Sequence, residues 1–267
     1  MSKAISANVD RFTGFTGYAE CYDAHRPKPP VAIVDLLAQV AGIARPKLVI
    51  DVGSGTGLST RVWSGRADRV IGIEPNPHMR QTAERIGGDV AYLDATSAHT
   101  TLPDACADVV TCSQSLHWLE PRATFAEVAR VLRPDGVFAA YDCDWPPAMN
   151  WRAEAAYNAF MEHVQRLEET HGIAETIRRW PKHEHLSRMR ESRVFRFTRE
   201  VVLHHTEPGD GGRLIELARS QGSVGTLLAR GLTEADLHLP HFRAAAQEHL
   251  PHAVPWYFSY RLRLGVK

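Results

Sequence analysis

Short apolar runs alternate with amphipathic stretches over the first half of the chain. The runs have the length of buried strands, and they cover residues 48–52, 69–74, 90–93, 108–112 and 137–141. The stretches between and before them repeat apolar residues at helical spacing, and they cover residues 31–41, 58–64, 77–86 and 122–132. Strands that are separated by helices of about ten residues form a parallel sheet with right-handed crossovers. The pattern therefore predicts a doubly wound α/β core.

After Asp144 this rhythm changes. Helical spacing recurs at 154–171, 214–228 and 234–250, and extended patterns occur at 194–205 and 254–265. We therefore expect a Rossmann-like, doubly wound, mostly parallel seven-stranded sheet with an N-terminal lid and a helical cap. The expected parts are a lid segment at 1–30, a cofactor-binding core at 31–143, a helical cap insertion at 144–192, and strands and helices at 193–267 that complete the sheet and cap.

Composition and charge exclude several classes of protein. The 267 residues carry 31 Lys and Arg against 31 Asp and Glu, so no net charge favours nucleic acid or an anionic membrane. No apolar run approaches the roughly 20 residues of a membrane span, and the first residues lack the apolar segment of a signal peptide. We expect a cytoplasmic protein, monomeric or homodimeric, that binds neither nucleic acid nor membrane.

The spacing of cysteine and histidine gives no sign of a metal site. The four cysteines form no C-x-x-C pair. His204 and His205 are adjacent on an expected strand, so their side chains point to opposite faces. No third ligand at a suitable spacing accompanies His183 and His185. The sequence predicts no metal.

Three features follow one another at the carboxyl ends of successive expected strands. The first is the glycine turn at 53–57, the second is Glu74, and the third is Asp94. Such strand ends meet where open α/β sheets bind ligands. An apolar strand that leads through glycines into a helix start exposes backbone N–H groups to a ligand, while the two acids suit ribose hydroxyls and an adenine amino group. Together they predict a cofactor that contains a nucleoside.

The residues around the glycine turn help to choose that cofactor. A dinucleotide site requires G-x-G-x-x-G, and Leu58 stands where the third glycine would be. Asp51 precedes the turn, and an acid at the mouth disfavours a pyrophosphate but suits a cationic group such as a sulfonium. These observations favour S-adenosylmethionine over NAD(P).

Several segments resemble motifs of the class I S-adenosylmethionine-dependent methyltransferases. Residues 51–57 (DVGSGTG) resemble motif I, and 72–76 (GIEPN) resemble the second-strand motif. Residues 102–118 resemble the fourth-strand motif, and 131–137 (VLRPDGV) are similar to the turn before strand five, with Asp135 in place of a glycine. The Arg-Pro pair at 26–27, after two tyrosines, resembles the small-molecule type 11 group, which includes trans-aconitate-methyltransferase-like enzymes. The resemblance covers about residues 15–142.

The resemblance implies a cofactor site and a product, S-adenosylhomocysteine. Its implied cofactor contacts are, in chain order, Tyr18, Arg26, Asp51, Gly53, Ser54, Gly55, Glu74, Pro75, Met79, Asp94, Ala95, Ser113 and Gln114. Among these, Arg26 is expected at the cofactor carboxylate, Glu74 at the ribose, and Asp94 with Ala95 at the adenine.

The catalytic and substrate residues are less strongly indicated. His117 follows the fourth strand in a polar and aromatic loop, and an imidazole that titrates near neutrality makes it the candidate base. The substrate candidates are Tyr22, His25, Trp118, Trp145 and Arg219. We expect in-line transfer of a methyl group to a small metabolite, with oxygen or carbon favoured as the acceptor atom. An NAD(P)-dependent oxidoreductase and a protein that binds S-adenosylmethionine without transferring its methyl group remain as alternatives.

Overall fold

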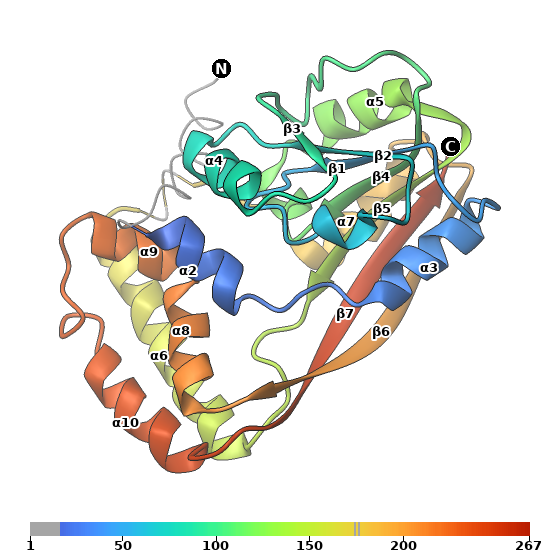
Figure 1. The fold of residues 1–267 in the computed structure, drawn as a ribbon. Helices are drawn as coiled ribbons and strands as arrows, with labels where there is room; N and C mark the ends of the chain where they lie inside the picture. The colour runs from blue at the N-terminus through green and yellow to red at the C-terminus, as the bar shows by residue number, and fades with distance from the viewer. Residues whose placement is uncertain (1–16, 174, 176) are drawn as a thin grey trace. The chain divides into compact units, whose positions relative to one another are not determined.

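The chain forms two compact units in the computed structural model, which describes residues 17–173, 175 and 177–267 (Figure 1). The core unit comprises residues 28–143, 179–203 and 260–267. The helical unit comprises, within the described residues, 17–27, 144–178 and 204–259. Each unit is therefore assembled from three separate stretches of chain.

The sheet has seven strands in the order β3-β2-β1-β4-β5-β7-β6. The strands are β1 (Leu48–Val52), β2 (Arg69–Ile73), β3 (Ala91–Leu93), β4 (Ala107–Ser113), β5 (Leu132–Cys143), β6 (Phe197–Gly209) and β7 (Val254–Val266). The first five strands pair in parallel, and β7 runs antiparallel to β5. The strand order reverses between β1 and β4, which is the switch point where ligands of such sheets bind. This confirms the expected mostly parallel, seven-stranded α/β fold.

Helices of the core unit lie alongside the strands (Figure 1). They are α3 (Val31–Val40), α4 (Pro77–Ile86), α5 (Pro121–Val131) and α7 (His185–Glu191), with short 3₁₀ turns η1 (Arg61–Trp63), η2 (Leu116–Trp118) and η4 (Lys182–Glu184). Asn76 and Glu120 start α4 and α5, because each side chain accepts two backbone N–H groups of the first turn and a proline follows. Buried apolar residues such as Ile50 and Phe138 fill the space beside the sheet.

Polar groups fix the starting edge of the sheet. The carboxylate of Asp108, at the start of β4, accepts the backbone N–H groups of Lys47 and Leu48, so β1 and β4 begin together. Arg133 Nη1 lies 2.5 Å from the other oxygen of Asp108. These contacts keep the carboxyl ends of both strands at the same level.

The helix expected at residues 58–64 is absent. The chain instead makes turns followed by η1. Ser59 and Thr60 donate their hydroxyls to the buried carboxylate of Asp51, at 2.6 and 2.8 Å, and these side-chain bonds hold the backbone in a tight turn. The positive end of a long helix therefore does not contribute to the glycine turn.

The helical unit is built from α2 (Tyr18–His25), α6 (Trp151–Thr170), α8 (Gly211–Arg219), α9 (Gly222–Ala229) and α10 (Leu239–His249). Helix α10 packs on α6 and α8, and Phe160 of α6 stacks on Phe242 of α10 with ring centroids 4.7 Å apart. Parts of β6 and β7 also belong to this unit. None of the helices described in the chain is long and apolar enough to cross a membrane.

The single helix expected at 214–228 is divided into α8 and α9. Ser220 ends α8, and Gln221 is extended. The carbonyl of Ser220 is thereby free to accept hydrogen bonds from Tyr18 Oη at 2.9 Å and Arg26 Nη2 at 3.0 Å. Tertiary contacts with a distant segment therefore decide this break.

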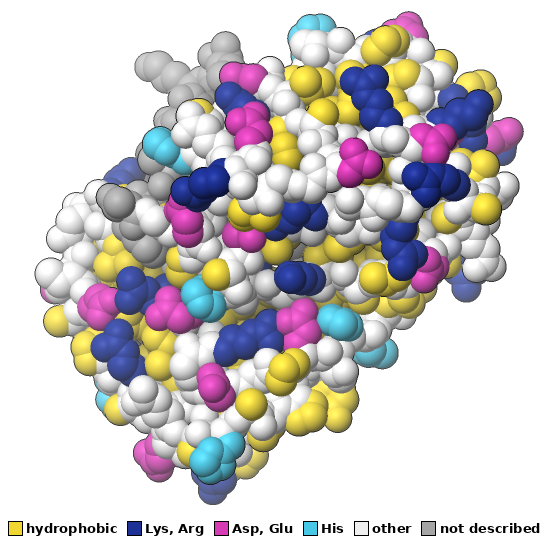
Figure 2. All heavy atoms as spheres, viewed as in Figure 1, with side chains coloured by type: hydrophobic (Ala, Val, Ile, Leu, Met, Phe, Trp, Pro, Cys, Tyr) yellow, Lys and Arg dark blue, Asp and Glu magenta, His cyan; other side chains and the backbone are white. Residues whose placement is uncertain are grey.

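On the molecular face in Figure 2, Lys and Arg are interspersed with Asp and Glu. The face shows no area of one charge sign. This agrees with the balanced composition of the chain.

Candidate functional site

The glycine turn is joined to the end of β2. Gly53 and Ser54 donate their N–H groups to the carbonyl of Ile73, at 2.9 and 3.1 Å. Gly57 has φ +85°, and a Cβ at this position would lie 2.1 Å from Tyr92 Oη. Only glycine fits this conformation and this close approach. Tyr92 was not expected in the site, because nothing in the spacing of a β3 residue indicates that it packs on a loop after β1.

Two buried hydroxyls of the turn have no hydrogen-bond partner among the described residues. They are Ser54 Oγ and Thr56 Oγ1, and their side chains are 4% and 1% exposed as residues. Buried polar groups are nearly always paired in folded proteins. Orphaned hydroxyls in a turn with exposed backbone fit the expectation that a polar ligand binds at this turn.

Asp51 does not lie at the mouth of the site as expected. It is fully buried, and its carboxylate accepts the hydroxyls of Ser59, Thr60 and Thr111 at 2.6–2.8 Å. Burial raises the pKa of this carboxyl, although the three hydroxyls oppose the rise. Asp51 thus supports the turn from inside the core, and its role as a direct cofactor contact stays a prediction.

Glu74 bridges the glycine turn and the start of α4. Its Oε2 accepts the N–H of Gly55 and its Oε1 accepts the N–H of Asn76, both at 2.8 Å. Burial raises the pKa of Glu74 to about 7, even though the two amides and Arg80 favour the charged form. The structure therefore brings the expected ribose acid directly against the expected cofactor turn.

The third expected acid lies beside the second. The N–H of Glu74 donates to the carbonyl of Leu93 at 3.1 Å, which sets the ends of β2 and β3 side by side. Arg80 joins them, since it donates to the carbonyl of Glu74 at 2.7 Å and pairs with the exposed Asp94 at 3.0 Å. Ala95 is buried next to Asp94.

The remaining expected adenosine residues surround this corner. Pro75 is half-buried after Glu74, and Met79 is 2% exposed on the first turn of α4. An apolar side chain and a proline ring beside two acids suit the face and the polar edges of a nucleoside.

Ser113 is the last residue of β4, and Gln114 follows it. Gln114 has φ +52°, and its side chain is held by Cys143 Sγ at 2.9 Å and by Lys182 Nζ at 3.2 Å. Ser115 Oγ donates to the carbonyl of Val52 at 2.8 Å, so the loop after β4 packs on the glycine turn. The loop after β4 and the turn after β1 thus pack against each other.

His117 lies in η2 within the same loop, and its side chain is 12% exposed. Its ring contacts Trp118 with centroids 4.8 Å apart. Burial lowers the pKa of His117 to about 4, and the charges of Lys182 and Arg179 lower it further while Asp142 opposes the shift. The expectation that this imidazole titrates near neutrality is therefore wrong; the ring is neutral at pH 7.

Asp142 of β5 is a site residue that the sequence pattern did not indicate. Its Oδ1 lies 3.5 Å from His117 Nδ1 and 2.9 Å from Lys182 Nζ, and its Oδ2 lies 3.3 Å from Arg263 Nη1. Burial alone would raise the pKa of this carboxyl, but the contacts with His117 and Lys182 hold it well below its ordinary range. A buried acid at the end of an apolar strand was the available signal.

Two expected cofactor residues, Tyr18 and Arg26, belong to the helical unit. Tyr18 is 1% exposed and donates to the carbonyl of Ser220 at 2.9 Å. Arg26 donates to the same carbonyl at 3.0 Å and to Gln221 Oε1 at 2.9 Å, and it stacks over the ring of Tyr22. The described contacts of both residues therefore organise the helical unit itself.

The other expected substrate residues of the helical unit lie in its polar network. Trp145 stacks under Arg26 at 4.8 Å. His25 Nδ1 lies 2.9 Å from the carbonyl of Cys21, and Arg219 pairs with Glu234 at 2.6 Å. Trp118, in contrast, belongs to the core unit, where Arg179 stacks over it at 4.7 Å. The substrate candidates thus divide between the two units.

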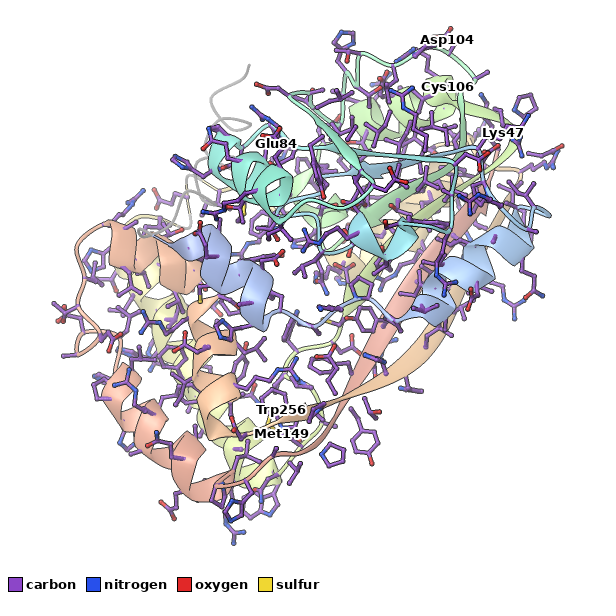
Figure 3. The ribbon with its side chains drawn as sticks, viewed as in Figure 1. Lys47, Glu84, Asp104, Cys106, Met149 and Trp256 are labelled. Carbon is purple, nitrogen blue, oxygen red and sulfur yellow. The ribbon has the colours of Figure 1, made fainter. Side chains whose placement is uncertain are left out.

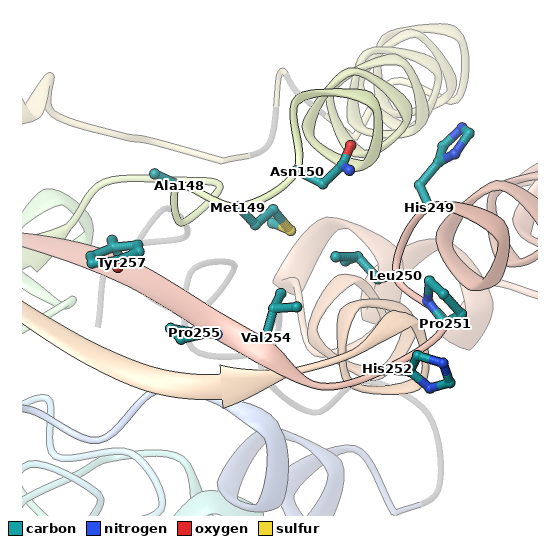
Figure 4. A pocket seen from close by; sticks show the side chains of 10 residues that line it. All are labelled: Ala148, Met149, Asn150, His249, Leu250, Pro251, His252, Val254, Pro255 and Tyr257. Carbon is teal, nitrogen blue, oxygen red and sulfur yellow. The ribbon is translucent and has the colours of Figure 1, made fainter.

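A pocket of about 440 Å³ lies within the helical unit (Figure 4). Its lining is Ala148, Met149, Asn150, His249, Leu250, Pro251, His252, Val254, Pro255 and Tyr257. None of the expected site residues is among them. The pocket therefore shares no residue with the site that the sequence predicts.

Part of the chain that carries these residues is similar to known proteins. Residues 50–140 match the family model described as a methyltransferase domain. The chain is 33% identical over 128 residues to the uncharacterized methyltransferase Rv3342 of Mycobacterium tuberculosis, covering 48% of this chain and 51% of the relative. It is 34% identical over 90 residues to a malonyl-[acyl-carrier protein] O-methyltransferase of Serratia marcescens, covering 33% and 35%. The chain thus spans about half the length, or less, of these curated relatives.

The fold is also found among solved structures. A proposed type II methyltransferase of Anaeromyxobacter dehalogenans superposes with a TM-score of 0.61 at 23% identity, covering 90% of this chain and 97% of that one. This likeness extends beyond the matched domain. It shows a shared fold over most of the chain.

Proposed function

We propose that this chain, in which residues 50–140 match the model of a methyltransferase domain, is a class I S-adenosylmethionine-dependent methyltransferase that transfers a methyl group to a small molecule. The observation that supports this most directly is the hydrogen bond between Glu74 and Gly55. It joins the glycine turn to the expected ribose acid, next to the orphaned hydroxyls of Ser54 and Thr56. S-adenosylhomocysteine would be the product.

The proposed cofactor site uses residues of the core unit. Gly53, Gly55 and Ser54 would line the methionine part, and Ser113 and Gln114 would face it from the loop after β4. Glu74 would accept the ribose hydroxyls, with Asp94 at the adenine. When bound, S-adenosylmethionine supplies a methyl group that its sulfonium has already activated. The protein then has to orient the acceptor and exclude water.

His117 is the proposed catalytic residue. Its neutral ring lies in the loop that carries Ser113 and Gln114, so it would take the proton of a hydroxyl acceptor. We favour oxygen or carbon as the acceptor atom. The Serratia relative is an O-methyltransferase, and this supports oxygen. Trp118 would form an apolar wall beside His117.

A binding experiment tests the cofactor. Isothermal titration calorimetry of the full chain with S-adenosylmethionine should give one site, and Glu74→Ala should weaken it about tenfold or more, since a hydrogen bond to a charged group contributes about 1.5–3 kcal/mol. The matched control is Glu84→Ala, which removes an exposed acid on α4 (Figure 3). Binding of NADH in place of S-adenosylmethionine would instead support the oxidoreductase alternative. An unchanged dissociation constant in Glu74→Ala would remove Glu74 from the site.

Transfer is tested separately from binding. The protein is incubated with S-adenosylmethionine that carries a labelled methyl group and with a panel of small hydroxy and carboxylic acids, and label in a product demonstrates transfer. His117→Asn should lower kcat and leave the cofactor dissociation constant unchanged. His183→Asn is the control, because His183 is 82% exposed on the neighbouring turn. Cofactor binding with no labelled product from any acceptor would favour a non-methylating use of the cofactor.

A further inference from the structure

Two histidines and a carboxylate converge in the core unit from three separate elements. His117 lies in η2, Asp142 in β5 and His185 in α7. Each offers one ligand atom, and these atoms all lie within 4.8 Å of one another. His185 is 1% exposed and Asp142 is 4% exposed, so the cluster is buried.

The two nitrogens His117 Nδ1 and His185 Nε2 have no hydrogen-bond partner among the described residues. The third group, Asp142 Oδ1, is ion-paired with Lys182 Nζ at 2.9 Å. The 3.5 Å between His117 Nδ1 and Asp142 Oδ1 is too long for a good hydrogen bond. Two unpaired imidazole nitrogens beside a carboxylate that already holds a cation mark a place where a metal ion would replace the Lys182 ammonium.

We propose that His117, Asp142 and His185 bind one divalent transition-metal ion, for which zinc is the probe. Two imidazoles and one carboxylate form a common ligand set for such ions, and Mg²⁺ prefers oxygen ligands. If an ion lay about 2.1 Å from both His117 Nδ1 and Asp142 Oδ1, which are 3.5 Å apart, the angle between these two ligand atoms at the ion would be roughly tetrahedral. The remaining coordination positions are open to water.

The ion pairs of Asp142 show which of its oxygens would bind the ion and which side chain would have to move away. Arg263 holds the Oδ2 of Asp142 and is itself paired with Glu200 at 2.8 Å, so Oδ1 faces the cluster. Lys182 Nζ lies 2.9 Å from Oδ1 and occupies the place of a cation. The Lys182 side chain is 35% exposed, and its flexible stem allows the ammonium to move into solvent.

Positive charge around the cluster opposes binding and therefore sets a measurable expectation. Arg179 and Lys182 act on His117, and Arg188 and Arg263 act on His185. Of these, Lys182 competes most directly, because its ammonium touches the ligand oxygen. Removal of Lys182 should consequently tighten metal binding, an effect opposite to that of removing a ligand.

The second cluster of potential ligands is less suitable. Cys21, His25 and Glu216 lie close together in the helical unit. Cys21 Sγ already contacts Glu216, His25 Nδ1 is bonded to a carbonyl, and burial raises the pKa of the Cys21 thiol to about 11. These groups satisfy one another, whereas the two histidine nitrogens of the first cluster have no hydrogen-bond partner among the described residues.

The experiment measures Zn²⁺ binding to the full, metal-depleted chain by competition with a chromophoric chelator, without cofactor. We expect one competitive site per chain. His185→Gln and Asp142→Asn should each weaken binding about tenfold or more, because even the partners behind metal ligands contribute 10–100-fold. Lys182→Met should strengthen it, and His183→Gln, an exposed histidine two residues from the ligand, should leave it unchanged. Circular dichroism confirms that each variant is folded.

Equal zinc affinity in the wild type, His185→Gln and Lys182→Met would overturn the proposal, because the ion would then bind surface histidines. If His185→Gln fails to fold, Lys182→Met decides alone. One consequence rests on the proposed function: a bound ion takes the Nδ1 lone pair of His117, so zinc should inhibit methyl transfer. Since the binding assay contains no cofactor or acceptor, its result stands or fails independently of the enzyme activity.

Discussion

We expect Glu74 to make the free energy of unfolding depend on pH, and we expect the substitution Glu74→Gln to remove this dependence. Burial raises the pKa of this carboxyl from 4.5 to about 7. The folded state therefore holds a proton that the unfolded state has lost between these two values. The associated stabilisation is fully present below pH 4.5 and is lost as the pH rises through 7.

The magnitude follows from the two pKa values. A rise from 4.5 to about 7 corresponds to roughly 3 kcal/mol of differential free energy. Glu74 is 8% exposed, so solvent screening reduces this figure little. Between pH 5 and pH 8, the contribution of Glu74 to the free energy of unfolding should fall by about 2–3 kcal/mol.

Urea unfolding at pH 5, 6, 7 and 8 measures this effect in the wild type and in Glu74→Gln. Other groups titrate in the same range, but they are common to both proteins, so the difference between the two curves isolates Glu74. Glu84→Gln, on the exposed side of α4, should give a curve parallel to the wild type. Curves that stay parallel for Glu74→Gln as well would refute the reasoning, since the burial of Glu74 would then not raise its pKa.

Three further changes probe the site and its support. Thr60→Val removes one of three hydroxyls from the buried Asp51 and should lower the free energy of unfolding by about 1.5–3 kcal/mol; a change below about 0.5 kcal/mol in urea titration would argue against this role. Gly57→Ala should destabilise more than Gly55→Ala, because both have positive φ but only Gly57 faces Tyr92; equal melting temperatures would contradict the close approach. Contact with Arg130 lowers the pKa of Glu127 to about 2, so the stability it contributes is present above pH 4.5 and is lost as the pH falls toward 2. Glu127→Gln should therefore destabilise the protein at pH 7 and have little effect near pH 2, as followed by acid unfolding.

Local patterns were sufficient for much of the core. The expected helix at 77–86 is observed with the same bounds, because a capping residue and a proline define its start in the sequence itself. The apolar run at 48–52 likewise forms β1. The helix expected at 58–64 was wrong, since the hydroxyls of Ser59 and Thr60 bond to a carboxylate whose position depends on the sheet.

The order of motifs along the chain determined which polar residues could meet. In a parallel sheet the ends of β1, β2 and β3 lie at one edge, so the glycine turn, Glu74 and Asp94 had to be neighbours once the fold was α/β. This follows from chain direction and strand pairing alone. No knowledge of side-chain packing was required.

Only the tertiary structure determined the ionisation states of Glu74 and His117 and the residues that each of them contacts. Burial, which no local pattern reports, makes Glu74 titrate near 7 and keeps His117 neutral. The meeting of His117 with Asp142 and His185 has the same origin, because residues far apart in the sequence converge through strand order and the packing of α7. Local sequence sets backbone conformation and periodicity, whereas desolvation and non-local contact exist only after the chain has folded.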